Sequence, residues 1–315
     1  MSTIQLHSCA SEKSVMSFPM GALCIKTAIN QTPELPKATL LEHTLAEDPV
    51  KAATSLNLKN VSFIGLSCYI WNIQWFEKFA LTIKKNNPNI IIFAGGPQTI
   101  DFENNFPSWL DFAVLGEGEI STITALKSII DGKKAENLQL DGIVTKNYKP
   151  AVSSKLPDLS KLTSPFLSGE ADSLINDYDS VLWEMTRGCP FGCAFCYESR
   201  GKSLVRDYPM DRIEKELTYL VSHEIVNVFV LDPTFNLNPE RAKQILKLLI
   251  SKAPADMHFT FEIRAELLDE EQAQLFSQLN CSLQIGLQSS DEEVLKQIGR
   301  RFDKQLFTNK VSLLT

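Results

Sequence analysis

Short apolar runs alternate with amphipathic stretches along this sequence, and this alternation limits the possible folds more than any other feature. Residues 90–93 (IIIF) are the clearest case, because apolar residues follow one another there without polar alternation. A strand with one solvated face alternates apolar and polar residues, so an unbroken run indicates a parallel strand that is covered on both faces. Parallel strands need crossover connections, which are usually helices. The pattern therefore predicts an α/β protein.

In the first part of the chain, the expected strands are residues 3–8, 38–44, 61–69, 89–97 and 112–118. The amphipathic stretches that are expected to form helices are residues 21–30, 48–57, 72–87 and 119–132. A strand-like segment at residues 141–147 ends this part. Strands and helices in this order predict a doubly wound, Rossmann-like domain over residues 1–150.

The composition changes at residues 151–179, which are rich in Pro, Ser, Lys and Asp and are expected to form a linker across the surface. Strands are expected again at residues 180–188, 227–235, 258–266 and 282–290. The helices expected between them are residues 210–224, 238–253 and 268–279, and residues 291–315 continue as an amphipathic helical pattern. Residues 180–315 therefore predict a second α/β domain with about four strand–helix units.

Cysteine usage and the lack of export features predict a cytoplasmic protein. The chain has 7 cysteines, an odd number, and its start lacks a basic stretch followed by an apolar one. No apolar run reaches the ~18 residues that a membrane span requires. In a reducing compartment, clustered thiols bind metals or do chemistry more often than they form disulfides. The formal net charge of −7 does not favour a general polyanion binder, so neither nucleic acid nor membrane is an expected partner.

Three of the cysteines, Cys189, Cys193 and Cys196, lie within "RGCPFGCAFCYES" with the spacing C-x3-C-x2-C. A structural zinc site normally has four protein ligands, and no histidine lies nearby. An iron–sulfur cube also needs four iron ligands, so three thiolates would leave one iron open for a substrate or cofactor. The motif directly follows a strand, where α/β sheets place active sites. A zinc site with Cys281 or His258 as a distant fourth ligand is the alternative.

With Phe195 before the last cysteine, the motif resembles the signature of the radical S-adenosylmethionine (radical SAM) superfamily. That resemblance implies a 4Fe-4S cluster on the three cysteines, with the open iron bound to the amine and carboxylate of SAM. It also implies reductive cleavage of SAM to a 5′-deoxyadenosyl radical, with electrons from a donor such as flavodoxin or ferredoxin.

Three later segments resemble further strands of that superfamily: "LDPTFN" (231–236), "FEIRAE" (261–266) and "QIGLQSS" (284–290). By period-2 alternation, Glu262 and Arg264 should share one face of their strand. The residues that this resemblance assigns to SAM are Phe195, Asp232, Glu262, Arg264 and Gln288. Asp232 as a turn cap and Arg264 as a solvated or ion-paired side chain are the structural alternatives.

In the first domain, "GLSCYIWN" (65–72), "AGGPQT" (94–99) and "LGEGE" (115–119) each end a predicted strand. They resemble the cobalamin-binding domain that precedes many radical SAM barrels. The cobalamin contacts that this implies are Ser67, Trp71, Gly95, Gly96, Gly116, Glu117 and Gly118. Glycine-rich strand ends also occur in sheets that bind nothing or bind ordinary nucleotides, and Trp71 and Trp75 are alternatively core residues.

One feature departs from cobalamin domains that supply a histidine to the cobalt. These carry D-x-H-x-x-G after the first strand, whereas this chain has "LHSCASEKS" there, with His7 inside the strand. Any cobalt bound here is therefore expected to lack a protein histidine ligand.

The combined resemblance implies methyl transfer from methylcobalamin to an unactivated carbon or phosphorus, or a radical rearrangement or cyclisation. Neither the small-molecule or peptide substrate nor any catalytic residue is defined by the sequence. A non-catalytic module that binds SAM or cobalamin is one alternative. Methylthiotransferase-like RNA modification is another, but the spacing of Cys9, Cys24 and Cys68 does not match its second cluster.

The radical SAM core usually has six strand–helix units, and only about four are expected in this sequence. The barrel is therefore predicted to be partial, as in a fragment, a degenerate copy or a chain completed by a second chain.

Overall fold

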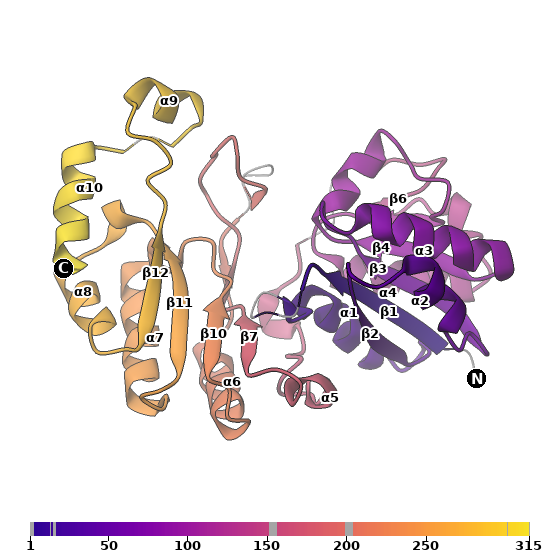
Figure 1. The fold of residues 1–315 in the computed structure, drawn as a ribbon, viewed down its shortest axis with the longest axis horizontal. Coiled ribbons are helices and arrows are strands. Elements are labelled where there is room, and N and C mark those ends of the chain that lie inside the picture. Colours follow the sequence, from indigo (N-terminus) through magenta and orange to yellow (C-terminus); the bar gives the residue numbers. More distant parts are fainter. Residues whose placement is uncertain are drawn as a thin grey trace. The chain divides into compact units, whose positions relative to one another are not determined.

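The computed structural model of the chain describes residues 3–12, 14, 17–150, 156–198, 204–300 and 302–314 (Figure 1). The chain divides into two compact units, Met1–Ala171 and Asp172–Thr315, which are described separately below. Each unit is built around a parallel sheet, so the predicted α/β class is confirmed. In the described part of the chain, no helix has the length and apolar character needed to span a membrane.

The sheet of the first unit has the order β2-β1-β3-β4-β5-β6. Its strands are β1 (Thr3–Ala10), β2 (Ala38–Thr44), β3 (Val61–Ser67), β4 (Ile91–Gly95), β5 (Phe112–Val114) and β6 (Ile143–Val144). The first five are parallel, and β6 runs antiparallel to β5. This is the flavodoxin-like doubly wound order, in which the strand order reverses between β1 and β3.

Helices cover both faces of this sheet. They are α1 (Met20–Asn30), α2 (Pro49–Ser55), α3 (Ile73–Asn86) and α4 (Gly118–Ile130). Ile92 of β4 belongs to a hydrophobic cluster with residues of α2 and α3, whereas its neighbour Phe93 belongs to a second cluster with residues of α1 and α4. Both side chains are buried, which explains the unbroken apolar run in β4.

A chain of polar contacts crosses β1 and β2 inside the aromatic core. The ring nitrogens His7 Nδ1 and His43 Nε2 are 3.0 Å apart, and His43 Nδ1 lies 3.2 Å from a carboxylate oxygen of Glu47. Trp75 and Phe79 of α3 pack against the His43 ring. If Glu47 accepts from His43, then His43 accepts from His7, and His7 is held as a neutral ring whose buried Nε2 has no hydrogen-bond partner. Burial, followed by the charge of His43, lowers the pKa of His7 to about 3.

We expect this depressed pKa to make unfolding easier in acid. The unfolded chain binds a proton at His7 below about pH 6.5, whereas the folded chain binds it only near pH 3. The unfolding free energy should therefore fall as the pH drops from 6.5 towards 3. The contribution is about 1.4 kcal/mol per pH unit. Urea unfolding of the wild type and His7→Leu at pH 7, 6 and 5 measures it as a difference between the two proteins. A difference that does not change with pH would contradict the prediction.

The described part of the predicted linker, residues 156–179, is divided between the two units. Residues 156–171 belong to the first unit and residues 172–179 to the second. Leu159 and Phe166 are buried, and the ammonium group of Lys26, on α1, lies 3.1 Å from the carboxylate of Glu170. The second unit begins with α5 (Asp172–Ile175). Residues 151–155 lie outside the described residues.

The second unit contains a four-stranded parallel sheet with the order β12-β11-β10-β7. Its strands are β7 (Ser180–Trp183), β10 (Asn227–Val230), β11 (His258–Ile263) and β12 (Cys281–Ile285). The helices α6 (Met210–Ser222), α7 (Pro239–Lys252) and α8 (Glu270–Phe276) connect these strands, and Figure 1 shows them along one face of the sheet. A short antiparallel pair, β8 (Thr186–Arg187) and β9 (Arg206–Asp207), is separate from the sheet.

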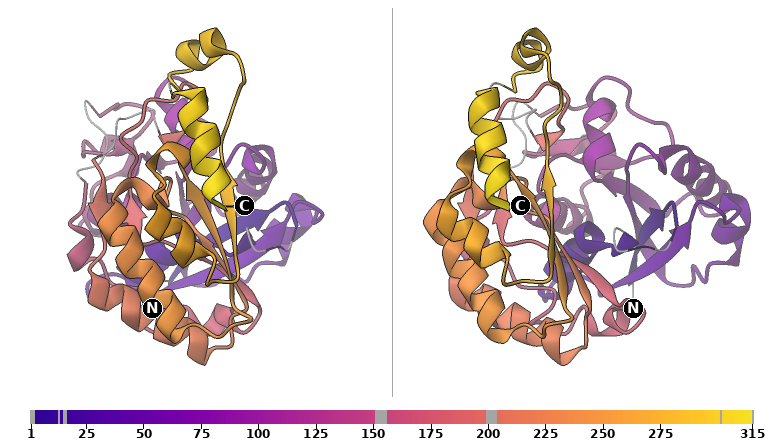
Figure 2. Two further views of the ribbon diagram at one scale, coloured as in Figure 1. Left: turned by 90° about the vertical axis from the view of Figure 1, so that its left-hand side faces the viewer. Right: turned by 60° about the vertical axis from the view of Figure 1, so that its left-hand side comes forward.

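The helical pattern of residues 291–315 is not one helix. It forms α9 (Glu292–Gln297) and α10 (Lys304–Val311), followed by a 3-10 turn (Ser312–Leu314). Gly299 has φ +68°, a left-handed conformation that ends α9. The expectation of a continuous helical pattern was therefore wrong. Figure 2 shows α9 beyond the end of β12 and α10 beside the helices of this unit.

Candidate functional site

The carboxyl ends of β7, β10, β11 and β12 meet at one edge of the sheet, because all four strands are parallel. The segments that follow them contain most of the predicted cluster and SAM residues. They include residues 188–198, called the cysteine loop here, which follows β8. The structure therefore brings the cysteine motif and the three later motifs to the same edge.

The three cysteines of the cysteine loop are not in disulfides, with Cys189 and Cys193 buried and Cys196 partly exposed. The backbone N–H of Cys196 donates to the carbonyl of Cys193 at 3.0 Å. Cys189 Sγ lies 3.9 Å from the hydroxyl of Thr234, which follows β10. Among the described residues, no three or more His, Cys, Asp or Glu side chains form a group that could hold a metal ion. The three thiols therefore share one short loop at the carboxyl edge of the sheet.

The alternative zinc site is not supported by the sheet topology. Cys281 and His258, its candidate fourth ligands, are the first residues of β12 and β11 and lie at the amino edge of the sheet. Six residues of strand separate the two edges at β11, which corresponds to roughly 20 Å. His258 Nε2 is instead 3.0 Å from the Ser282 hydroxyl, and the Cys281 thiol donates to the carbonyl of Phe276 at 3.5 Å. Neither residue can close a tetrahedron with the cysteine loop.

Asp232 follows β10 and reaches back to the chain that leads into the cysteine loop. Its side chain is 2% exposed, and one carboxylate oxygen accepts hydrogen bonds from the amides of Met185 at 2.8 Å and Thr186 at 2.9 Å. Burial raises its pKa to about 7, although the two amides act in the opposite direction. Asp232 is therefore a long-range anchor of the segment between β7 and β8. A contact between Asp232 and SAM stays a prediction.

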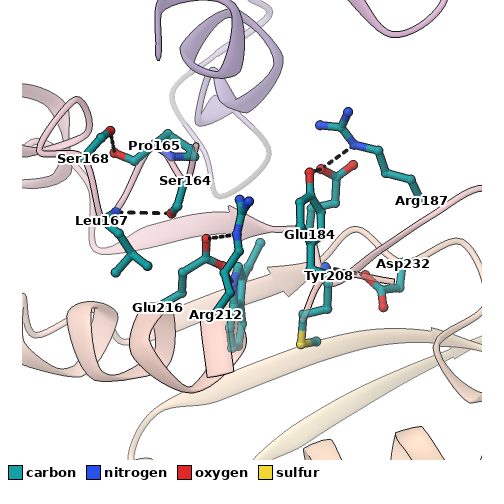
Figure 3. A network of polar contacts seen from close by, with 12 residues as sticks. Ser164, Pro165, Leu167, Ser168, Glu184, Arg187, Tyr208, Arg212, Glu216 and Asp232 are labelled. Carbon is teal, nitrogen blue, oxygen red and sulfur yellow. Dashed lines mark hydrogen bonds and ion pairs between the residues drawn. The ribbon is translucent and has the colours of Figure 1, made fainter. Parts of the chain in front are cut away.

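Polar residues that the sequence did not reveal hold the same segment. Arg241, on α7, donates to the carbonyls of Met185 at 3.1 Å and Tyr208 at 2.7 Å. Glu184 accepts from Arg187 Nε at 2.9 Å and from the Tyr208 hydroxyl at 3.1 Å (Figure 3). The partners are far apart in the sequence, apart from the Glu184–Arg187 pair, so no local pattern could identify them. Together they fix the entry to the cysteine loop.

Arg264 contacts the cysteine loop directly. Its guanidinium carbon lies 3.7 Å from the centre of the Phe191 ring, between Cys189 and Cys193 in the sequence. Its Nε donates to the Glu266 carboxylate at 2.6 Å. The guanidinium thus combines an ion pair with a cation–π contact, and this matches the ion-paired alternative for Arg264. Its role towards SAM stays a prediction.

The other predicted SAM residues lie in different environments. Glu262 is half-buried in β11, and burial followed by the charge of Glu198 raises its pKa. Gln288 is exposed beyond the end of β12, and its φ of +67° is in the left-handed region. Phe195 is 55% exposed on the cysteine loop. The structure describes these positions and leaves their role as SAM contacts a prediction.

The predicted cobalamin residues lie at the carboxyl edge of the sheet in the first unit. Ser67 and Gly95 are the last residues of β3 and β4, and Gly116, Glu117 and Gly118 lie at the junction of β5 and α4. Trp71 follows β3, is 51% exposed, and stacks on Tyr69 with ring centres 4.4 Å apart. Trp75 is a core residue, as the alternative interpretation expected, because it is only 7% exposed and belongs to the hydrophobic cluster.

The glycines at this edge differ in whether the structure leaves room for a side chain. A Cβ on Gly96 would lie 2.5 Å from the backbone oxygen of Cys68, and its φ of 99° and ψ of 172° are confined almost entirely to glycine. A Cβ on Gly118 would meet Ile25 of α1 at 3.0 Å. In contrast, a Cβ on Gly95 would have no atom within 4 Å. Gly96 is required by the fold, while Gly95 borders open space.

Alanine at these adjacent positions should affect stability and cobalamin binding differently. We expect Gly96→Ala to lower the unfolding free energy by about 3 kcal/mol, from backbone strain and the contact with Cys68. Gly95→Ala should leave the unfolding free energy nearly unchanged and weaken cobalamin binding, because a methyl group would occupy space that the corrin approaches. Thermal unfolding and titration with hydroxocobalamin measure both. Unchanged cobalamin affinity in Gly95→Ala would remove this residue from the proposed contacts.

Two known protein families match the two units in tandem. The model of the B12 binding domain matches residues 19–126, and the model of the radical SAM superfamily matches residues 183–310. The doubly wound unit and the parallel sheet with its three-cysteine loop thus correspond to a B12-binding domain followed by a radical SAM domain, as predicted.

Several known proteins are similar over most of the chain. The cobalamin-dependent radical SAM methyltransferase TokK of Streptomyces tokunonensis is 25% identical, over 87% of this chain and 45% of its own length. The 2-(S-pantetheinyl)-carbapenam-3-carboxylate methyltransferase of Streptantibioticus cattleyicolor is 26% identical over the same shares. The chain therefore spans about half the length of the curated relatives it matches.

A solved structure has the same fold over nearly the whole chain. It is the radical SAM methyltransferase TsrM of Kitasatospora setae, with cobalamin and a [4Fe-4S] cluster bound. Its TM-score is 0.77, at 16% sequence identity, over 99% of this chain and 67% of the TsrM chain. The fold extends through both units.

Proposed function

We propose that this chain is the cobalamin- and SAM-binding part of a cobalamin-dependent radical SAM methyltransferase. The observation that carries the proposal is the loop of three cysteines at the carboxyl edge of a parallel sheet, preceded by a B12-binding domain. Relatives along most of the chain are named as methyltransferases, which favours methyl transfer over rearrangement or cyclisation.

The donor set of the cysteine loop fits an iron–sulfur cluster. Cys189, Cys193 and Cys196 lie within eight residues of one loop, and thiolates are the protein ligands that iron–sulfur clusters use. The Thr234 hydroxyl, 3.9 Å from the Cys189 sulfur, is a polar neighbour of one of these ligands.

When bound, the cluster would supply the electron that cleaves SAM, and cobalamin would carry the methyl group. The chain's own residues would hold and orient these groups. Arg264 and Phe191 pack against each other at the cysteine loop. We infer that SAM binds at this edge of the sheet, with Phe195, Asp232, Glu262, Arg264 and Gln288 as its contacts.

For cobalamin, we infer a site at the carboxyl edge of the first sheet, formed by Ser67, Trp71 and the glycine-rich turns after β4 and β5. His7 does not serve as a cobalt ligand in this proposal, because its ring is 0% exposed and one of its nitrogens contacts His43. The exposed indole of Trp71 offers an apolar face to a corrin ring at this edge.

The partners follow from this chemistry. A radical SAM domain needs a low-potential electron donor, and we propose a flavodoxin or ferredoxin. The substrate is a small molecule or a peptide. Cysteines outside disulfides and a cluster that oxygen would damage favour the reducing cytoplasm.

Anaerobic reconstitution with iron and sulfide tests the proposal. The expected result is broad iron–sulfur absorbance in the visible range, followed by 5′-deoxyadenosine when SAM and dithionite are added. Zinc bound in place of iron would contradict the proposal. Cluster and cobalamin binding without SAM cleavage would favour the non-catalytic module.

A further inference from the structure

The turn after α9 contacts the cysteine loop through its backbone. The carbonyl of Ile298 accepts a hydrogen bond at 2.8 Å from the backbone N–H of Ala194, the residue directly after Cys193. Gly299, the next residue of the turn, lies so close to Gly192 that a Cβ would be 2.6 Å from the Gly192 carbonyl oxygen. These contacts lie on either side of Cys193 in the sequence.

The same turn is tied to the end of β12. Arg300 is 7% exposed, and its guanidinium donates to the carbonyl of Gly286 at 2.7 Å. The backbone N–H of Arg300 donates to the carbonyl of Leu295 in α9 at 2.8 Å. The turn is therefore fixed to the sheet on one side and contacts the cysteine loop on the other.

We propose that the 298–300 turn, formed by Ile298, Gly299 and Arg300, is a positioning element that holds the cysteine loop for cluster binding. The proposal rests on the proposed function, because it assigns the loop a cluster. The three cysteines are distributed over eight residues of this loop, so the loop backbone decides where their thiols lie. A restraint around Cys193 limits the conformations of the loop, which should raise the affinity for the cluster.

Glycine at position 299 is the part of the turn that a mutation can test most sharply. Gly299→Ala adds a methyl group against the Gly192 carbonyl and forces alanine into a φ of +68°. One control variant separates these effects. Gly132→Ala has the same kind of backbone strain, at φ +97°, but its methyl group would have no atom within 4 Å, and it lies in the first unit.

The first measurement is amide hydrogen exchange of the full chain before any cluster is added. Ala194 should exchange slowly in the wild type and in Gly132→Ala, and more rapidly in Gly299→Ala. Rapid exchange of Ala194 in the wild type would overturn the contact on which the proposal depends. This measurement does not require cluster chemistry, so it remains informative whatever the outcome of reconstitution.

The second measurement is anaerobic reconstitution across a range of iron and sulfide concentrations. We expect about tenfold weaker cluster binding in Gly299→Ala than in Gly132→Ala, with an altered EPR spectrum of the dithionite-reduced cluster. If Gly299→Ala does not fold, Arg300→Lys replaces it as the test variant. Its shorter side chain weakens the link to Gly286 and should weaken cluster binding in the same direction by a smaller amount. Equal binding and identical spectra in all variants would overturn the proposal. A wild type that binds no cluster would overturn the proposed function, and the role of the turn in cluster binding with it.

Discussion

Cys193→Ala will reduce the iron content of reconstituted protein to background and abolish the formation of 5′-deoxyadenosine. An iron–sulfur cube held by three thiolates keeps one iron open for SAM, so two remaining thiolates leave a second iron without a protein ligand. Cys189→Ala and Cys196→Ala should have the same effect. Iron and sulfide analysis, the visible spectrum, and chromatography after incubation with SAM and dithionite measure these changes.

Cys281→Ala is the matched control for the cysteine variants. Cys281 is also a free, partly exposed thiol, but it lies at the amino edge of the sheet. Burial raises the pKa of its thiol, which favours the protonated form that does not bind iron. Its replacement should leave the iron content unchanged. Iron loss in Cys281→Ala, or full iron content in Cys193→Ala, would contradict the assignment of the three ligands.

Much of the fold could be predicted because its signals are local. The apolar run of residues 90–93 indicates a strand that is covered on both faces, and Ile92 and Phe93 do enter different hydrophobic clusters. The break at Gly299 was missed because amphipathic periodicity continues on both sides of it. Gly299, which has a left-handed backbone conformation and where a Cβ would lie 2.6 Å from the Gly192 carbonyl oxygen, ends α9.

The site could be predicted only as far as its motifs are contiguous. The spacing of the cysteines identified the loop, and parallel strands brought the later motifs to the same edge. The partners of individual side chains were not predictable. The amides that Asp232 binds are 46 and 47 residues away in the sequence, and no local pattern encodes such a contact. Gly95 and Gly96 likewise cannot be told apart from the sequence. Only the position of the Cys68 backbone shows that a side chain would clash at Gly96 and not at Gly95.

Asp232 matters both for the stability of the second unit and for the site, because its carboxyl group accepts two buried hydrogen bonds at the entry to the cysteine loop. Its pKa is raised by burial from 3.8 to about 7. A folded-state pKa above the unfolded value stabilises the fold below pH 3.8, and this stabilisation is lost as the pH rises through 7. The wild type at pH 8 therefore holds a buried carboxylate whose burial costs stability.

Asp232→Asn should increase the unfolding free energy at pH 8 and have little effect at pH 4. The asparagine oxygen can still accept from the amides of Met185 and Thr186, and the side chain carries no charge at any pH. The gain should grow by about 1.4 kcal/mol per pH unit between the two pKa values and then level off. Urea unfolding of both proteins from pH 4 to pH 8 measures it. A difference that stays constant with pH would show that burial does not control this carboxyl group.

Asp232→Ala should instead destabilise the protein at every pH. Both amides would lose their acceptor while remaining buried, at a cost of about 1–3 kcal/mol for each. The segment between β7 and β8 would then be free to move, so iron binding by the cysteine loop should also fall. Asp232→Asn keeps the acceptor and should keep the iron, which separates the hydrogen bonds from the charge. If both variants lose iron equally, the carboxylate itself contributes to the SAM and cluster site, and Asp232 is more than an anchor.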